Sequence, residues 1–138
     1  MTAPDFLDSN VLIYAYDLSN PEKQRTAQDF LKSRITARAV ISTQVLAEFA
    51  AVMLHKVSPP ASADAVMEAL DVLVPLRLIV PDGELVRRAV EAHVTYGLHF
   101  YDGMIVAAAE RAGCERIWSE DLNAGQEYFG ITVTNPFN

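Results

Sequence analysis

The sequence is short of the residues that mark several classes of protein. Its 138 residues include one cysteine, Cys114, so no internal disulfide can form, and we expect a cytoplasmic protein. No apolar run reaches the roughly 20 residues that a transmembrane helix needs, and the first residues do not resemble a secretory signal. There is no glycine-rich phosphate loop, and the three histidines lack the paired spacing of a zinc site.

Basic side chains are also scarce. The chain has 11 lysines and arginines against 18 acidic residues, a formal net charge of −7, whereas nucleic-acid-binding proteins are usually basic. Three explanations stay open: the acidic excess aids solubility, faces a basic protein partner, or lies in one pocket where divalent cations neutralise it. Composition is otherwise ordinary, with 51% hydrophobic and 21% charged residues, and predicts a single domain over residues 1–138.

What the sequence does contain is an alternation of short apolar strands with capped helices. The strands are predicted at 5–7, 39–41, 76–80, 116–118 and 131–133. Cap residues and helix breakers place helices between them, at 11–16, 20–33, 43–56, 62–73, 82–96 and 101–112. This alternation predicts an α/β fold with a central, mostly parallel five-stranded sheet flanked by helices.

Four acidic residues fall near the ends of these strands. Asp8 follows the first strand, Asp121 follows the fourth, Asp102 lies at a helix start, and Glu48 lies in the helix after the second strand. Each acid alone has an ordinary explanation as a turn residue, a helix N-cap or a solvated side chain. Because ligands of open α/β sheets bind beyond the carboxyl ends of the strands, the joint placement favours one acidic site.

The chemistry of such a site is that of a hard divalent cation. Carboxylates without histidine or cysteine partners suit Mg²⁺, with Mn²⁺ as a second possibility, and not zinc. Magnesium held by acids binds a phosphodiester and activates water, which predicts hydrolysis of a nucleic-acid backbone. Repulsion among the carboxylates should raise at least one pKa when metal is absent. The number of ions, one or two, stays open.

Four segments of the chain together resemble PIN-domain proteins. They are FLDSNVLIYA at 6–15, STQVLAEF at 42–49, YDGMIVAAA at 101–109 and WSEDLN at 118–123. They occur in the order and at the spacing of that family, and they span nearly the whole chain. The size of the chain and its lack of added domains are most similar to the VapC-type toxins of toxin–antitoxin pairs.

The resemblance implies a Mg²⁺-dependent endoribonuclease that arrests translation by cutting RNA, is held inactive by a cognate antitoxin protein, and forms a homodimer. It also implies roles for individual residues. Asp8, Asp102 and Asp121 would be metal ligands, and Glu48 would be a ligand or would orient the attacking water. Two polar residues, Asn10 and Ser119, match positions that support the carboxylates, while Glu120 competes with Asp121 for its role.

Two other functions remain as alternatives. The first is a PIN-like module that binds RNA or protein without cutting. The second is an aspartate-based phosphatase, although such enzymes usually carry a second acid two residues after the first, where this chain has Asn10.

Two surfaces also have open interpretations. Candidate RNA contacts are Lys23, Arg25, Arg34 and Arg38, although a solvated helix face explains these residues more simply. The segments 11–16 and 45–54 carry more apolar bulk than one helical face buries. They either complete the core or form a homodimer contact and an antitoxin groove.

Overall fold

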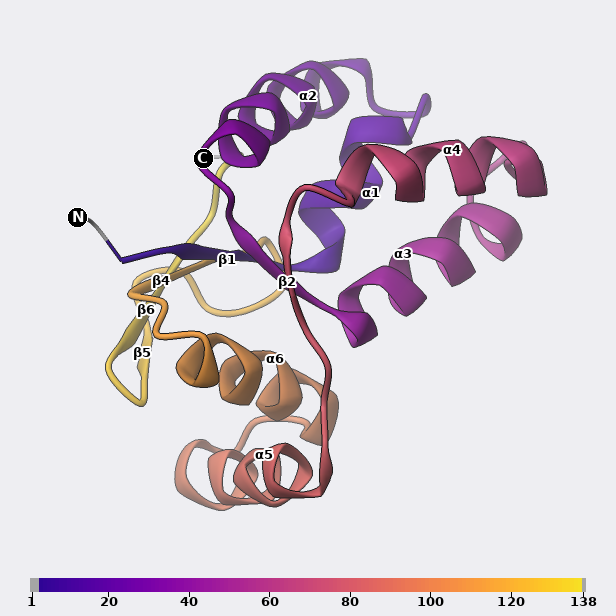
Figure 1. The fold of residues 1–138 in the computed structure, drawn as a ribbon. Coiled ribbons are helices and arrows are strands. Elements are labelled where there is room, and N and C mark those ends of the chain that lie inside the picture. The colour runs from indigo at the N-terminus through magenta and orange to yellow at the C-terminus, as the bar shows by residue number, and fades with distance from the viewer. Residues whose placement is uncertain (1–2, 138) are drawn as a thin grey trace.

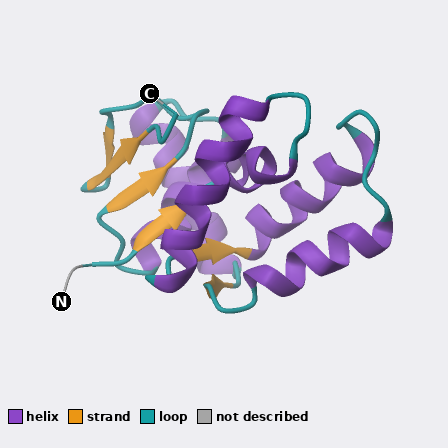
Figure 2. Cartoon of the chain, turned by 90° about the horizontal axis from the view of Figure 1, so that it is seen from above, coloured by secondary structure: helices purple, strands orange, loops and turns teal. Residues whose placement is uncertain are grey.

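A six-stranded sheet runs through the middle of the molecule. The computed structural model describes residues 3–137, and its strands lie in the order β3-β2-β1-β4-β6-β5. Neighbouring strands are parallel except for the β5–β6 pair, and Figure 2 shows the arrows side by side. The strands are β1 (Asp5–Leu7), β2 (Val40–Ser42), β3 (Arg77–Ile79), β4 (Arg116–Trp118), β5 (Glu127–Tyr128) and β6 (Ile131–Thr134). The predicted α/β class is confirmed.

Helices cover both faces of this sheet. In Figure 1, α1, α2 and α4 lie above the strands, α6 and α5 lie below them, and α3 extends to one side beneath α4. Their bounds are α1 (Ser9–Tyr16), α2 (Pro21–Thr36), α3 (Thr43–His55), α4 (Ala63–Leu73), α5 (Gly83–Tyr96) and α6 (Phe100–Arg111). Because both faces are covered, the central strands are apolar throughout, and Phe6, Leu7 and Val40 have no exposed surface.

The helix starts follow the local chemistry that the sequence indicated. Asn20 accepts a hydrogen bond from the backbone N–H of Lys23 at 3.2 Å, and Pro21 occupies the first helical position. Ser42, Ser62 and Asp82 cap α3, α4 and α5 in the same way. These caps fix where each helix leaves the sheet, and so fix which residues reach its carboxyl edge.

Two features differ from the prediction. The sheet has six strands and not five, because the two-residue strand β5 pairs antiparallel with β6 through a turn at Phe129 and Gly130, whose φ angles are 49° and 81°. In addition, α6 begins at Phe100 and its N-cap is His99, so the explanation of Asp102 as an N-cap is wrong. Asp102 lies inside the first turn of the helix.

The lone cysteine and the helices also agree with the sequence analysis. Cys114 is buried and packs in the core. Within residues 3–137, no helix combines the length and the apolar character needed to cross a membrane.

Candidate active site

Asp8 lies where β1 becomes α1, and it is the most enclosed acid of the site, with 4% of its surface exposed. One carboxylate oxygen accepts the backbone N–H of Ser9 at 2.7 Å, and the other accepts the Ser119 hydroxyl at 2.8 Å. The pKa of Asp8 is raised to about 6, chiefly by burial and also by the charges of Glu48 and Asp121, despite these two hydrogen bonds. Asp8 therefore lacks compensation for its negative charge.

Asn10 and Ser119 connect the end of β1 to the end of β4. The Asn10 amide donates to the Ser119 hydroxyl and to an Asp121 carboxylate oxygen, both at 3.2 Å. The Asn10 carbonyl accepts the backbone N–H of Glu120 at 3.0 Å, and the Ser119 hydroxyl accepts that of Asp121 at 3.1 Å. Both residues thus contact the carboxylates that the sequence analysis expected them to support.

Glu48 is held by two donors that sequence reasoning missed. The Ser9 hydroxyl donates to one of its oxygens at 2.8 Å, and the Gln44 amide donates to the other at 2.8 Å. Gln44 precedes Glu48 by one helical turn, which was the available signal. The same Gln44 amide donates to the backbone carbonyl of Tyr101 at 3.0 Å, so α3 is fastened to the start of α6.

Asp102 reaches the same neighbourhood from the first turn of α6. It is half-buried, and burial is the main reason its pKa is raised. The charges of Asp121 and Glu48 add to the rise, while His99 opposes it. Because Glu48 and Asp121 act on both Asp8 and Asp102, the four predicted carboxylates share one site at the carboxyl edge of the sheet.

The adjacent acids Glu120 and Asp121 face different surroundings. The Lys23 ammonium forms an ion pair with Glu120 and lies over the Tyr14 ring, 4.6 Å from its centroid. Asp121 is exposed, and it receives its hydrogen bond from Asn10. Glu120 is therefore matched by a cation, and Asp121 is the member of the pair that joins the other carboxylates.

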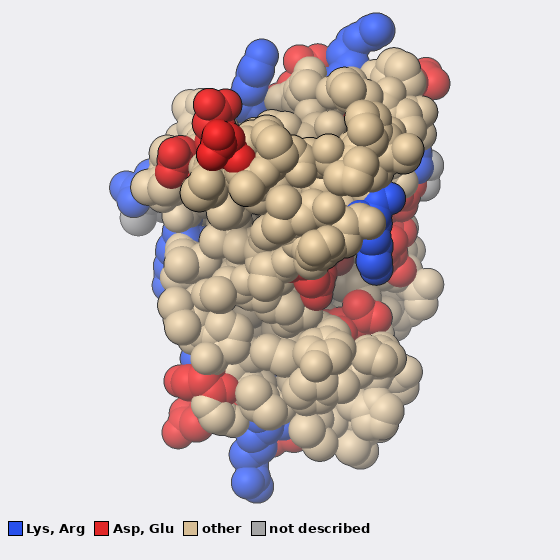
Figure 3. Space-filling model, turned by 90° about the vertical axis from the view of Figure 1, so that its right-hand side faces the viewer, with Lys and Arg blue, Asp and Glu red and all other residues tan. Residues whose placement is uncertain are grey.

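The site carries negative charge without a protein cation to balance it. Among residues 3–137, the ion pairs use other acids, namely Asp5, Asp82, Glu91, Glu110 and Glu120. Figure 3 shows acidic side chains in a hollow that crosses one face of the molecule. In that same described part, no three histidine, cysteine or acidic side chains are already arranged around one point as metal ligands. The fit to a divalent cation rests on the donors, which are all carboxylate oxygens beside an uncompensated buried acid.

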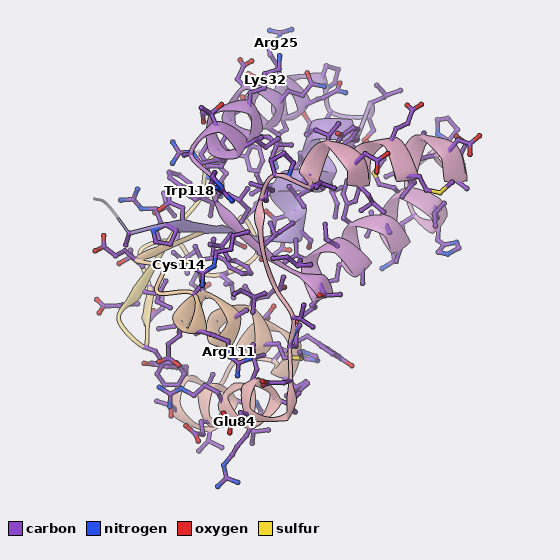
Figure 4. All side chains as sticks on the ribbon, in the orientation of Figure 1. Arg25, Lys32, Glu84, Arg111, Cys114 and Trp118 are labelled. Carbon is purple, nitrogen blue, oxygen red and sulfur yellow. The ribbon has the colours of Figure 1, made fainter. Side chains whose placement is uncertain are left out.

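The basic candidates for RNA contact are less suitable than the sequence indicated. Lys23 is in the ion pair with Glu120, and Arg34 pairs with Asp5 at 2.8 Å. Arg25 and Arg38 are exposed, and Figure 4 shows Arg25 pointing away from the sheet on the outer side of α2. A cavity of about 660 Å³ lined by Asp5 and Arg34 opens at the opposite edge of the sheet, so cavity size does not identify the site.

Comparisons with known proteins agree with this architecture. A family model described as PIN domain matches residues 6–126. No curated protein matches the chain in sequence.

Three solved structures have similar folds at low sequence identity. The sarcin–ricin loop cleaving toxin VapC20 of Mycobacterium tuberculosis is 16% identical with a TM-score of 0.69, over 85% of this chain and 89% of that one. FitAcB from Neisseria gonorrhoeae is 19% identical with a TM-score of 0.67, over 96% and 98%. VapBC2 from Rickettsia felis, bound to a promoter DNA fragment, is 17% identical with a TM-score of 0.67, over 95% and 97%.

Proposed function

Because the chain belongs to the PIN-domain family, we propose that it is a metal-dependent endoribonuclease and the toxin of a toxin–antitoxin pair. The observation that carries this proposal is Asp8, a buried carboxylate next to further carboxylates and without a cation to balance it. A buried charge of this kind is costly unless something compensates it, and a bound cation does so. PIN domains are typically nucleases, and the match to the family covers most of the chain.

The residues of the site have distinct roles in this proposal. Asp8, Asp102 and Asp121 would hold Mg²⁺ or Mn²⁺. When bound, such an ion offsets the charge of the phosphodiester and lowers the pKa of the attacking water. Glu48 has both oxygens fixed by Ser9 and Gln44, and each oxygen keeps a free lone pair that can accept a proton or a hydrogen bond from that water.

Asn10 and Ser119 keep this arrangement in place. Their hydrogen bonds join Asp8 to Asp121 across the β1–β4 pair, so neither carboxylate can turn away from the other without breaking one of these hydrogen bonds. Asn10 also stands where an aspartate-based phosphatase usually carries its second acid, and it is committed to these hydrogen bonds. The geometry therefore favours a nuclease over a phosphatase.

An RNA substrate and a toxin role are supported by the structural neighbours. VapC20 is described as a toxin that cleaves the sarcin–ricin loop, and its fold overlaps most of this chain. VapBC2 and FitAcB are complexes that include an antitoxin, and we propose that this chain likewise has a cognate antitoxin as its partner.

An apolar groove offers that antitoxin a place to bind. Cavities of about 310, 140 and 190 Å³ meet at Tyr16 and lie among α1, α2, α3 and α4. Phe49 and Met53 line this groove, which is where the sequence analysis expected an apolar surplus. We assign it to an apolar segment of the antitoxin.

We propose that the homodimer contact lies on α5, and not on the segments 11–16 and 45–54 that the sequence analysis considered for it. Val86, Val90 and Val94 recur at every fourth residue and are 40%, 47% and 77% exposed. An apolar stripe of this kind on a helix surface is typical of a protein interface. Measuring the mass in solution of the native chain and of Val90→Glu tests this placement, because the charged variant should be monomeric.

The catalytic test uses substitutions that keep shape and remove charge. Glu48→Gln, Asp102→Asn and Asp121→Asn should each reduce RNA cleavage in Mg²⁺ by about 100-fold or more, since each removes a group acting on the water or the metal. Glu120→Gln is the matched control, because it changes the neighbouring acid that Lys23 already neutralises. It should retain cleavage within a fewfold.

Two results would refute the assignment. Full cleavage by two of the three site variants would remove these residues from the mechanism. Intact RNA after incubation of the native protein with Mg²⁺ or Mn²⁺, across a range of structured and unstructured RNAs, would favour the non-catalytic alternative.

A further inference from the structure

Tyr101 is an exposed aromatic residue beside the acidic site. It immediately precedes Asp102, and 57% of its surface is exposed. The other four tyrosines are buried or half-buried. An aromatic ring left in water does not gain the free energy that burial would supply, and its flat apolar face stays available to a ligand.

The Tyr101 ring is backed by a second aromatic ring. The His99 ring stacks on it with 5.8 Å between centroids and an interplanar angle of 24°, and Phe100 packs edge-on at 5.3 Å. One face of the tyrosine is thus supported by the protein. The exposed surface can receive another flat group in the same stacking direction.

The backbone of Tyr101 is fixed at both of its polar groups. Its N–H donates to the His99 ring nitrogen Nδ1 at 3.2 Å, and its carbonyl accepts the Gln44 amide at 3.0 Å. Because the residue is held before any ligand arrives, less conformational entropy is lost when the ring is used for binding.

These same contacts join the ring to the carboxylates. Gln44 donates to Tyr101 and to Glu48 through one amide nitrogen, and His99 lies near enough to Asp102 for their charges to interact. The His99–Tyr101 stack therefore lies at the edge of the acidic site, next to the position of the proposed cleavage.

An acidic protein needs a source of RNA affinity other than lysine and arginine. The net charge is −7, and the lysine beside the site is paired with Glu120. Stacking of a base on an aromatic ring does not depend on charge, and every base has a flat face that can use it.

We infer that one unpaired base of the RNA, next to the phosphodiester that is cut, stacks on Tyr101 with His99 supporting the ring from the other side. This inference rests on the proposed nuclease function. It makes Tyr101 a residue that determines which RNA conformations are accepted, because a base held in a continuous duplex cannot reach the ring.

The test measures binding of a short single-stranded RNA in EDTA, where no metal-dependent cutting occurs. Tyr101→Ala should weaken binding by about 5- to 150-fold, the range found when single stacking aromatics are removed. Tyr101→Phe keeps the flat face and should bind within about twofold of the native protein. Val74→Ala, at an exposed position at the end of α4, is the control for a surface truncation.

A single abasic site moved along the RNA locates the stacked base. At one position it should weaken binding to the native protein and add nothing to the defect of Tyr101→Ala, since both changes remove the same contact. The fold-loss from Tyr101→Ala should also be unchanged between low and moderate salt, unlike a loss of phosphate contacts. Tyr101→Leu retains apolar volume without the ring face, and should behave like Tyr101→Ala.

The outcomes separate the inference from the proposed function. Three results would overturn the stacking role, even if cleavage is observed. Tyr101→Ala could bind RNA as tightly as the native protein, or an abasic site could weaken binding equally in the native protein and in Tyr101→Ala. Alternatively, Tyr101→Ala could lose the homodimer while keeping its RNA affinity. A native protein that neither binds nor cuts RNA would overturn the proposed function itself.

Discussion

Replacing Asp8 with asparagine should make the metal-free protein more stable at neutral pH. Asp8 is buried, and its pKa in the folded protein is about 6 against an ordinary value of 3.8. The folded state therefore binds a proton more readily than the unfolded state, so stability falls as pH rises from 3.8 to 6. Above that window both states are ionised and the full cost of burying the charge is present.

The size of this cost follows from the shift. One pKa unit corresponds to 1.36 kcal/mol, so a displacement of about two units costs about 3 kcal/mol at pH 8. Asparagine has no charge to bury and can still cap α1, although it no longer accepts the Ser119 hydroxyl, a loss of about 1 kcal/mol. We therefore expect the free energy of unfolding of Asp8→Asn at pH 8 to be about 2 kcal/mol higher than that of the native protein.

Measuring stability at two pH values separates the cost of the buried Asp8 charge from the effect of the lost Ser119 hydrogen bond. Urea unfolding in EDTA should show that the advantage of Asp8→Asn shrinks by about 2 kcal/mol between pH 8 and pH 4.5, because native Asp8 is then protonated when folded. Asp71→Asn, at an exposed position on α4, should show the same small effect at both pH values. Saturating Mg²⁺ should then stabilise the native protein and leave Asp8→Asn nearly unchanged.

One result would refute this reasoning. If Asp8→Asn is less stable than the native protein by the same amount at both pH values, Asp8 contributes as a helix cap and hydrogen-bond acceptor, and its buried charge carries no cost for a metal to relieve.

Two further predictions concern the surroundings of the site. Lys23→Met should leave the slope of log RNA affinity against log salt nearly unchanged, because Lys23 is paired with Glu120; a slope smaller by about one would show instead that Lys23 leaves Glu120 for a phosphate. Gly103→Ala should destabilise the protein by about 1–3 kcal/mol in thermal unfolding, since its Cβ would lie 2.6 Å from the Ala89 carbonyl oxygen on α5. Gly83→Ala, which meets open space, should be neutral or slightly stabilising, and equal effects at the two glycines would contradict the packing argument.

Much of the fold was predictable because local chemistry and tertiary structure agree. Asn20-Pro21, Ser42, Ser62 and Asp82 cap helices as expected, and Gly97 ends α5 with a φ of 71°. The strand β5 was missed because two residues show no periodicity, and because its turn places the non-glycine residue Phe129 at positive φ. Arg88 stacks on Phe129, with its guanidinium 3.6 Å from the ring centroid, and this is a long-range contact that no local pattern indicates.

The placement of the carboxylates, and of Asn10 and Ser119 beside them, could be predicted from the sequence, but the donors that hold Glu48 could not all be predicted. The ends of strands and the phase of helices can be inferred from the sequence pattern, and they predicted that Asp8 and Asp102 lie at one edge of the sheet. Whether Ser9 reaches Glu48 depends on the distance between α1 and α3, which the sequence does not contain, whereas Gln44 lies one turn before Glu48 on the same helix. The pairing of Lys23 with Glu120 is likewise set by the packing of α2 against the end of β4, and it reduced the set of free basic residues.

The order of the strands has a consequence for how the chain is made. Phe6 pairs with Val40 on one side and with Ile117 on the other, so the middle of the sheet cannot be completed until the chain has been made as far as Ile117. A growing polypeptide on the ribosome holds β1 with one flank open until β4 has been synthesised, and Asp121 follows β4 directly. The four carboxylates therefore cannot meet before residue 121 has been synthesised, and until then the nascent chain has no complete acidic site.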